Sequence, residues 1–577
     1  MPTISISKSD LERLVAMPDK PRTISLSQLD EWLTLVKGEV KGYQAETGEL
    51  RIELQDSNRP DLWCCEGIAR QIRIKREGTF KPYPFLSQRP RRPKRLLVDP
   101  ELQSIRPYVA ACAARGYQVT EQGLAQLIQT QEKLADIFGR KRKMVSVGLY
   151  RLEPIQFPIT YEAVNPDDVR FTPLGVETVM TLSEMLMVHP KGVEYGTLLA
   201  GQSRVPFLRD AVHQPLSFPP IINSREIGEV RIGDDQLLIE VTGTNIAMVV
   251  LALNILAANL ADRGAAIEPV AVHYPYDTPL GRRVVTPCVL SRPRSISLET
   301  IEQALGQRLG VHTVKEALES YGYQVSVKRK SAMVQVQLPP YRHDLMHAMD
   351  VVEDVAMSLG YGTFAPEMPS QFTVGGLSRL EQVSDRVRDL MVGLGFQEIM
   401  SNILGSPDAY CNAMRLEGTP WGRMVEVANV MSANFSCLRQ WMVPSLLRVE
   451  AASARSFYPH RLFEVGEVAI PDLTHELGSR TESILGALIA HASAHFSELH
   501  SCLDSLLYHV GITYVLEPIS HPSFLEGRVG KIVASNTMLE LGLIGELHPE
   551  VLERWQIAVP VTAFEINLSR LVDLEQL

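Results

Sequence analysis

The sequence predicts an α+β protein of several domains, two of which are small, related helix–strand modules. Three observations predict this fold class: the length of the chain, its division by proline-rich stretches and an internal repeat. A chain of 577 residues is long enough for about three to five domains. Its 45% hydrophobic content excludes a disordered chain, and its net charge of −10 means that nucleic acid would have to bind a local basic patch.

Prolines and charge runs divide the chain into four blocks and one linker. The first block, 1–85, ends before an extended Pro- and Arg-rich linker over 86–95. The second block, 96–278, mixes helical and strand patterns, and the third, 279–370, closes in a proline-rich stretch. The fourth block covers 371–577.

Hydrophobic periodicity predicts individual elements within these blocks. Amphipathic patterns predict helices over 122–138 and 378–394. The segment 230–241 is expected to form two strands around a Gly-Asp-Asp turn, and 541–547 to form a core strand. The apolar run 246–261 is interrupted by two asparagines and is too short and too polar to span a bilayer, so it predicts a buried helix.

An internal repeat relates the first block to the third. The segments 5–14 and 295–305 both read as a helix with a serine N-cap. Farther along, Arg-Pro-Asp-Leu at 59–62 matches Arg-His-Asp-Leu at 342–345, each after a β-like run and before a second helix. We therefore expect two modules of one ancestry.

Acidic residues of the third block form a candidate metal site. Asp344 precedes a helix predicted over 347–359, and on this helix Asp350, Glu353 and Asp354 share one face. A ligand set of oxygens without His or Cys is the kind that Mg²⁺ prefers. A solvated acidic face near a helix N-terminus, where the helix dipole favours negative charge, is the alternative.

The repeat favours the metal or a partner over the solvated face. The first module keeps the Arg-x-Asp-Leu turn but has Gly67, Arg70 and Gln71 at the positions of the three helix acids. Since one copy folds without these acids, we expect them to serve a partner or a metal.

Cysteine usage and the N-terminus predict a cytoplasmic protein. The seven cysteines are odd in number and include no Cys-x-x-Cys spacing, which disfavours a zinc ribbon and a secreted disulfide framework. The first residues carry neither a basic leader nor an apolar core. We expect a soluble protein that has no membrane partner.

Motifs in order along the chain point to one family. They are Asn-Arg-Pro-Asp-Leu at 58–62, Arg-His-Asp at 342–344 with the acids that follow, Val-Ala-Asn-Val-Met-Ser at 427–432 and Arg-Leu-Phe-Glu-Val-Gly at 461–466. Together they resemble the β subunits of phenylalanine–tRNA ligase. The chain lacks an oligonucleotide-fold insertion near residue 40 and an extra C-terminal anticodon domain, which resembles the archaeal and eukaryotic form.

The resemblance implies an α2β2 heterotetramer that joins phenylalanine to tRNA(Phe), with ATP as a substrate of the complex. It implies an N-terminal module over 1–85, an α/β editing domain over 96–278 and a magnesium-associated module over 279–370. Residues 371–577 would form a class II synthetase-like domain with an antiparallel sheet. No Gly-x-Gly-x-x-Arg occurs between 480 and 577, so we expect this domain to lack the catalytic motifs and the α partner to carry the synthetic site.

The same resemblance assigns the acidic cluster. It implies that Asp344, Asp350, Glu353 and Asp354 hold Mg²⁺ together with the α subunit. All four positions carry an acid in this sequence.

Editing, the hydrolysis of mischarged tyrosyl-tRNA at a second site, has a physical rationale. An apolar pocket built for phenylalanine rejects the added hydroxyl of tyrosine only about 100-fold. The editing-pocket candidates of the second block are Leu208, Ser217, Glu240 and Thr242. Glu240 could accept the phenol proton, and Thr242 or Ser217 could position a water at the ester. The ordinary alternatives are that Ser217 lies in a proline-rich loop and that Glu240 ends a strand. In the family this position often carries Asp, so Glu240 departs from the family's pattern.

Two other functions stay open at this point. Basic runs at 89–95 and 140–143 are candidate contacts to tRNA phosphates, although such runs are more often solvated surface. A stand-alone RNA-binding or scaffolding relative without editing activity would use the same runs. A self-sufficient synthetase is disfavoured by the missing glycine-rich motif.

Overall fold

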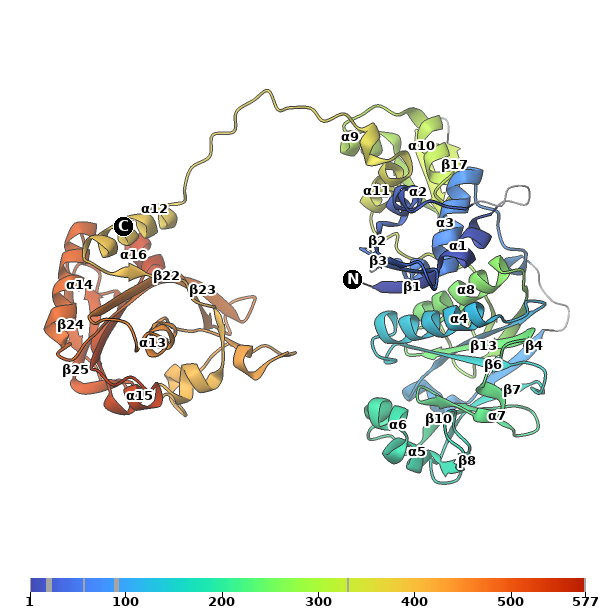
Figure 1. Cartoon of the computed structure of the whole chain (residues 1–577), viewed down its shortest axis with the longest axis horizontal. Coiled ribbons are helices and arrows are strands. Elements are labelled where there is room, and N and C mark those ends of the chain that lie inside the picture. Colours follow the sequence, from blue (N-terminus) through green and yellow to red (C-terminus); the bar gives the residue numbers. More distant parts are fainter. Residues whose placement is uncertain (1, 17–22, 56–57, 88–92, 329–331, 575–577) are drawn as a thin grey trace. The chain divides into compact units, whose positions relative to one another are not determined.

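The computed structural model describes residues 2–16, 23–55, 58–87, 93–328 and 332–574. The chain forms two compact units, 1–367 and 368–577 (Figure 1). Each unit combines helices with sheets, so the predicted mixed α and β multidomain architecture is confirmed.

The first module is a three-stranded sheet covered by helices. Its elements are β1 (Thr3–Ser7), α1 (Lys8–Val15), α2 (Leu26–Leu33), β2 (Gly38–Gln44), β3 (Glu49–Leu54) and α3 (Cys65–Glu77). The strand order is β1-β3-β2. Ser7 caps α1 by accepting a hydrogen bond from the Asp10 amide, and Ile4 and Ile6 of β1 alternate into the core.

The second module repeats this plan. Its elements are β16 (Arg294–Ser297), α9 (Leu298–Leu305), α10 (Gly310–Glu319), β17 (Gln324–Lys328), β18 (Met333–Gln337) and α11 (Ala348–Leu359). The strand order β16-β18-β17 is again first, third, second, and Ser297 caps α9 as Ser7 caps α1. The predicted relationship between the two modules therefore extends to their topology.

Between the two modules in sequence lies one large mixed sheet. Its order is β12-β11-β10-β7-β4-β14-β5-β13-β6, with β15 paired to β14. The strands are β4 (Lys94–Val98), β5 (Tyr108–Arg115), β6 (Val145–Arg151), β7 (Ile159–Val164), β10 (Val205–Arg209), β11 (Pro215–Phe218), β12 (Ile222–Asn223), β13 (Gln236–Gly243), β14 (Ala266–His273) and β15 (Arg283–Thr286). Strand β4 begins inside the range predicted as linker, and β15 continues the sheet past residue 278.

The sheet carries several smaller elements. They are α4 (Glu121–Lys133), α5 (Leu182–Val188), α6 (Pro190–Tyr195), α7 (Arg225–Gly228) and a small hairpin of β8 (Arg170–Phe171) and β9 (Met180–Thr181). The prediction of two strands over 230–241 is wrong in its first half. Instead of pairing as a strand, this half turns at Gly233, whose amide bonds to the Val119 carbonyl, while Asp234 accepts from the Val119 amide.

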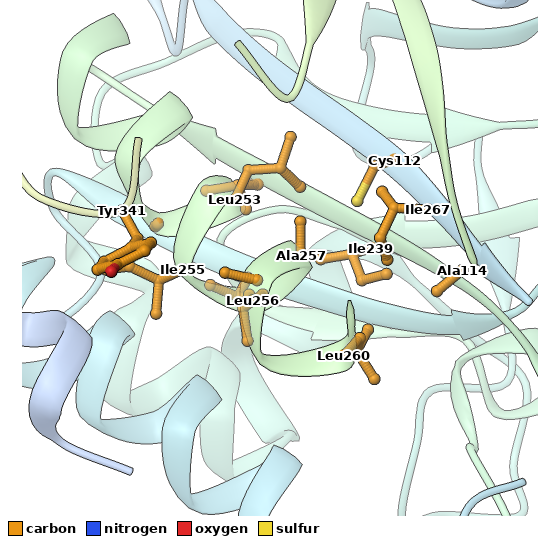
Figure 2. Close-up of a cluster of buried hydrophobic side chains, with 14 of the residues drawn as sticks. Cys112, Ala114, Ile239, Leu253, Ile255, Leu256, Ala257, Leu260, Ile267 and Tyr341 are labelled. Carbon is orange, nitrogen blue, oxygen red and sulfur yellow. The ribbon is translucent and has the colours of Figure 1, made fainter. Parts of the chain in front are cut away.

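Helix α8 (Ile246–Asp262) is the centre of the larger core (Figure 2). It is buried on nearly all sides, with Leu253, Ala257 and Leu260 in the same apolar cluster as Cys112 and Ile239 of the sheet. Asn254 satisfies its amide by donating 2.8 Å bonds to the carbonyls of Cys288 and Pro340. The predicted buried helix is confirmed, and none of the described helices is long and apolar enough to cross a membrane.

The second unit is built on a seven-stranded sheet with the order β19-β22-β23-β27-β26-β25-β24. Its strands are β19 (Gln397–Glu398), β22 (His460–Pro471), β23 (Ser479–Ala490), β24 (Tyr514–Pro518), β25 (Phe524–Ala534), β26 (Glu540–Leu547) and β27 (Val561–Asn567). All pairs are antiparallel except β19 with β22. A short hairpin joins β20 (Leu404–Gly405) and β21 (Cys437–Leu438).

Helices cover both faces of this sheet. The first face is covered by α12 (Arg379–Gly393), α14 (Phe496–Val510) and α16 (Leu568–Leu574), and the second by α13 (Val443–Ala452) and α15 (Pro549–Arg554). Along β23, Leu485, Ala487 and Ile489 face the first set, whereas Leu488 and Ala490 face the second. The predicted helix over 378–394 and the core strand over 541–547 are both present.

Candidate functional site

A cavity of about 250 Å³ lies against the edge of the large sheet formed by β6 and β13. Two of the four predicted editing residues, Ser217 and Glu240, line it. Gly148 of β6 lies directly opposite Glu240 of β13. A Cβ atom at Gly148 would come within 2.6 Å of Glu240 Oε2, so this strand position has no room for a side chain.

Glu240 has a buried carboxyl group, and only one of its two oxygens accepts a hydrogen bond from a described residue. The residue is 2% exposed, and its Oε2 accepts a 2.8 Å hydrogen bond from the Tyr150 hydroxyl. Oε1 is buried as well, and no described residue hydrogen-bonds it. Burial raises the pKa of Glu240 to about 7, against the opposing effects of Tyr150 and Arg106.

Tyr150 links the two predicted residues. Its phenol oxygen lies 2.8 Å from Ser217 Oγ and 2.8 Å from Glu240 Oε2. A phenol carries a single proton, so Tyr150 can donate to the carboxylate only while the serine hydroxyl donates to it. Because Tyr150 is itself fully buried, the three side chains form a fixed polar cluster at the wall of the cavity.

The other two predicted editing residues lie outside the cavity lining. Leu208 of β10 is fully buried in an apolar core, where its backbone pairs with that of Ser217. Thr242 is also fully buried; its Oγ1 accepts a 3.0 Å bond from Arg106 Nε and lies 2.9 Å from Ser146 Oγ. Their predicted roles therefore have no support from the geometry of the described residues.

Sequence reasoning missed several residues of this site. Tyr150 and Gly148 were not singled out, although a glycine inside an apolar strand is a signal of close backbone approach. Arg142, from the basic run at 140–143, lines the cavity and donates to the carbonyls of Pro220 and Ile221 at 3.0 and 2.8 Å. That part of the basic run is thus held by the protein itself.

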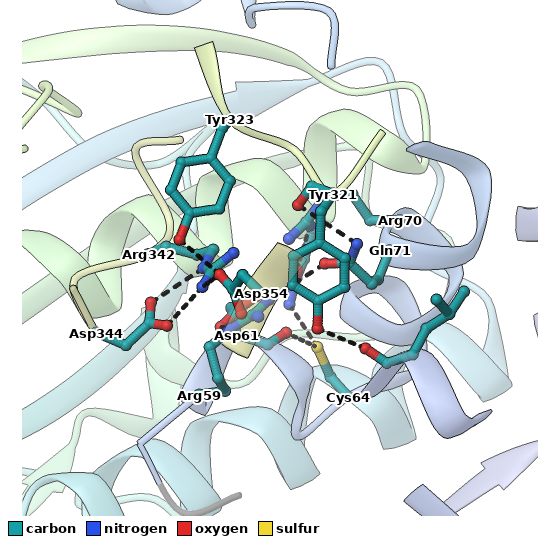
Figure 3. A network of polar contacts seen from close by, with 12 residues as sticks. Arg59, Asp61, Cys64, Arg70, Gln71, Tyr321, Tyr323, Arg342, Asp344 and Asp354 are labelled. Atoms are coloured by element: carbon teal, nitrogen blue, oxygen red, sulfur yellow. Dashed lines mark hydrogen bonds and ion pairs between the residues drawn. The ribbon is translucent and has the colours of Figure 1, made fainter. Parts of the chain in front are cut away.

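The acidic cluster is organised around Arg342 (Figure 3). Its guanidinium donates two bonds to Asp344, at 3.0 and 2.6 Å, and a 2.7 Å bond to Asp354 Oδ2. Tyr323 also donates to Asp354 Oδ2, at 2.5 Å. The first module has the same arrangement, since Arg59 donates two 2.8 Å bonds to Asp61.

The two buried acids differ in their proton affinity. Burial by itself would raise both pKa values, but the charges of Arg342 and Arg59 hold the pKa of Asp344 down at about 2. For Asp354 the burial dominates, and its pKa is raised despite the contact with Arg342. Both acids therefore have structural partners that require no metal.

The other two predicted metal ligands are more open. Asp350 caps the start of α11, where Oδ2 accepts 2.6 Å bonds from the Met346 and His347 amides. Glu353 forms a 2.6 Å ion pair with Lys37, and its side chain is 47% exposed. In the described part of the chain, no three His, Cys, Asp or Glu side chains are placed to hold a metal ion together. The four predicted ligands do not by themselves form a closed metal site.

In the second unit, the segment 461–466 also has its polar groups paired. Glu464 forms a 2.9 Å ion pair with Arg439 and accepts a bond from Ser401, and both charged residues are almost fully buried. This arrangement leaves little of the arginine exposed for a ligand.

Comparisons with known proteins agree over nearly the whole chain. Residues 294–361 match the tRNA synthetase B5 domain, and 365–568 match the phenylalanyl tRNA synthetase beta chain CLM domain. A phenylalanine–tRNA ligase beta subunit from Borrelia turicatae is 35% identical over 99% of this chain and 100% of its own length. One from Pyrococcus furiosus is 38% identical, with the same coverage.

A solved structure supports the same relationship for the first unit. It is an N-terminal fragment of the phenylalanyl-tRNA synthetase beta subunit from Pyrococcus horikoshii, with a TM-score of 0.57 and 35% identity, and it covers 63% of this chain and 100% of its own. Because full-length relatives share more than a third of their residues with it, the chain belongs to the family of phenylalanine–tRNA ligase beta subunits.

Proposed function

We propose that this chain works in an α2β2 phenylalanine–tRNA ligase, in which the α subunit synthesises phenylalanyl-tRNA(Phe) from ATP, phenylalanine and tRNA. In this proposal, the β chain binds tRNA and hydrolyses tyrosyl-tRNA at the cavity beside Glu240. The observation that carries the editing role is the buried, unpaired Oε1 of Glu240 at the cavity wall.

An unpaired acceptor of this kind favours tyrosine over phenylalanine. A tyrosyl phenol can donate to Oε1, and a hydrogen bond to a charged group contributes roughly 1.5–3 kcal/mol. A phenylalanyl ring would instead leave the carboxyl group dehydrated and unpaired, which is costly. The cavity would therefore select the hydroxyl that the synthetic pocket rejects poorly.

Features of the second unit favour contact with a partner subunit over a synthetic site of its own. Its buried Arg439–Glu464 pair is committed within the fold. Several large apolar side chains on this unit are exposed, Met400, Met431 and Phe457 almost completely and Val430 and Phe435 about half. Exposed apolar surface of this kind is typical of a protein interface, which fits an α subunit.

In this proposal, Mg²⁺ binds only where the α subunit completes the site. Asp350, Glu353 and Asp354 each keep one carboxylate oxygen to which no described residue donates a hydrogen bond. These oxygens fit a hard cation, but the cation would need further ligands from outside the chain. Bound there, Mg²⁺ would supply positive charge at an interface.

The editing proposal is tested by Glu240→Ala in the ligase reconstituted with an α subunit. Deacylation of tyrosyl-tRNA(Phe) should fall about 10- to 150-fold in Glu240→Ala, which matches the energy of the lost bond. Phenylalanine-dependent exchange between ATP and pyrophosphate should not change, because the synthetic site lies elsewhere.

Two outcomes would contradict this proposal. Wild-type deacylation by Glu240→Ala would make Glu240 an ordinary buried strand residue. A wild-type complex that leaves tyrosyl-tRNA(Phe) intact would instead favour an RNA-binding or scaffolding chain without editing activity.

A further inference from the structure

We infer that Tyr150 is a positioning residue, which holds one oxygen of Glu240 so that only the other can accept a hydrogen bond from a ligand in the cavity. This inference rests on the proposed editing function and names the residue that sets the orientation of its specificity group. The phenol of Tyr150 occupies Oε2 at 2.8 Å, while Oε1 has no partner among the described residues.

A ligand cannot displace Tyr150 from this contact. Its ring is fully buried in an apolar cluster with Leu208, Leu216 and Leu238. Two residues before Tyr150 on the same strand, the missing side chain of Gly148 makes the room that the Tyr150–Glu240 contact needs, since a Cβ there would lie 2.2 Å from the Tyr150 hydroxyl. The pair is therefore part of the folded domain and is in place before any ligand enters.

Fixing Oε2 has a consequence for recognition. A carboxylate with both oxygens open can rotate and accept from donors in several positions, whereas a fixed one presents a single oxygen in a single direction. The cavity would then accept a hydrogen bond only from a hydroxyl at one position on the ring of the aminoacyl group. Tyr150, itself a phenol on the same carboxylate, does not compete with a tyrosyl ligand because it uses the other oxygen.

Tyr150 also affects the charge of Glu240. Burial raises the pKa of Glu240 to about 7, and the hydrogen bond from Tyr150 opposes that rise. Arg106, which is buried and bonded to Thr242 and Ser146, acts in the same direction as Tyr150. The other charged side chains in the lining are Glu132, Arg142 and Lys191. Loss of the phenol should therefore shift the titration of Glu240 to higher pH.

The experiment compares Tyr150→Phe with the wild-type chain, each in the ligase reconstituted with an α subunit. Deacylation of tyrosyl-tRNA(Phe) is measured against substrate concentration from pH 5.5 to 8.5. We expect KM for tyrosyl-tRNA to rise roughly 3- to 10-fold, the size of effect that one hydrogen bond of ordinary strength contributes, because Oε1 is no longer held in one direction, with a smaller change in kcat. The pH midpoint of kcat/KM should move upward, because Glu240 stays protonated to higher pH.

A matched control separates positioning from loss of stability. Tyr274→Phe removes another buried phenol of the same domain, one that bonds to the backbone of Val109 and does not line the cavity. It should lower the thermal unfolding temperature as Tyr150→Phe does, but leave KM and the pH midpoint unchanged.

The outcomes are distinguishable. If the wild-type complex deacylates tyrosyl-tRNA and Tyr150→Phe has the same KM and pH midpoint, the role of Tyr150 is overturned while the proposed function stands. If Tyr274→Phe shifts both quantities as much as Tyr150→Phe, the effect is one of stability and the inference is again overturned. If the wild-type complex has no deacylation activity, the proposed function fails and this inference fails with it.

Discussion

Gln71 and Asp354 occupy equivalent positions in the two related modules, and each accepts a hydrogen bond from the arginine of its own Arg-x-Asp turn. Arg59 donates to Gln71 Oε1 at 3.4 Å, and Arg342 donates to Asp354 Oδ2 at 2.7 Å. Both contacts are buried. Asp354 is therefore needed as an acceptor by the fold, although an amide can fill that place, and Glu353 is the acid of α11 that the fold uses least.

This relationship predicts different costs for two substitutions of Asp354. Asp354→Asn keeps a side chain of the same length, with an acceptor oxygen for Arg342 and Tyr323. The free energy of unfolding should therefore fall by only about 1–2 kcal/mol. Asp354→Leu removes the acceptor and leaves part of the Arg342 charge unpaired, so the loss should be about 3–5 kcal/mol. Denaturant unfolding of the full chain measures both values.

Gln71→Leu in the first module is the matched control. It removes a long bond, 3.4 Å, from Arg59 to an uncharged amide, and it should cost no more than about 1.5 kcal/mol. Equal losses for Asp354→Asn and Asp354→Leu would show that Asp354 does not act as the acceptor for Arg342.

Glu353→Gln should separate assembly from folding. The side chain is half exposed and its ion pair with Lys37 is a surface pair, so the free energy of unfolding should change by no more than about 1 kcal/mol. If Glu353 holds Mg²⁺ with the α subunit, the magnesium concentration needed for half-maximal α2β2 assembly should rise. Analytical ultracentrifugation across a magnesium titration measures this value.

Glu319→Gln is a suitable control for that experiment, because it removes a carboxylate of a similar ion pair, with Lys315, elsewhere in the same module. An unchanged magnesium dependence in Glu353→Gln would favour the solvated acidic face that the sequence left as the alternative.

Much of the fold could be predicted because it depends on local patterns. The Arg-x-Asp turns of the two modules, the apolar helix α8 and the amphipathic helix α12 each have a signature within a few residues of sequence. The repeat also identified Asp344 as part of a recurrent turn. It indicated as well that the fold does not need the helix acids; the structure adds that the position of Asp354 needs a hydrogen-bond acceptor, which Gln71 provides in the first module without a charge.

The candidate site was harder to predict because its contacts join distant strands. Tyr150 meets Glu240 and Ser217 across separations of 90 and 67 residues. Thr242 lies two residues from Glu240 and is therefore on the same face of the strand. Its hydroxyl is nevertheless bonded to Arg106 and Ser146. Sequence spacing gives the face of a strand, but which groups share that face depends on the register of its neighbours.

Gly148→Ala should break the polar cluster of Tyr150, Ser217 and Glu240, because Gly148 lies on the same strand as Tyr150 and pairs with Glu240. The added methyl group would lie 2.2 Å from the Tyr150 hydroxyl and 2.6 Å from Glu240 Oε2, so one of the two side chains must move. Deacylation of tyrosyl-tRNA(Phe) by the reconstituted ligase should fall at least 10-fold, and the thermal unfolding temperature should drop. Gly42→Ala, where the added Cβ meets no neighbour, should change neither. Full deacylation by Gly148→Ala would place the specificity group elsewhere.

Glu565 predicts how the stability of the second unit depends on pH. It is buried on β27, and Oε1 accepts hydrogen bonds from the amides of Met442 and Val443 at the start of α13. Burial raises its pKa to about 7, despite those two bonds. Between about pH 4.5 and pH 7 the folded chain therefore keeps a proton that the unfolded chain releases, so the free energy of unfolding falls as the pH rises through this range.

Glu565→Gln should remove this pH dependence, because the amide oxygen still accepts from both backbone amides and no longer titrates. The variant should match the wild type near pH 4.5 and exceed it above pH 7, by a free energy of unfolding on the order of 3 kcal/mol. Thermal unfolding of the full chain from pH 4.5 to pH 8 measures the difference. Glu526→Gln, at an exposed position, should follow the wild-type curve. A Glu565→Gln curve parallel to the wild type at every pH would mean that this carboxyl group is already ionised in the folded chain at pH 4.5.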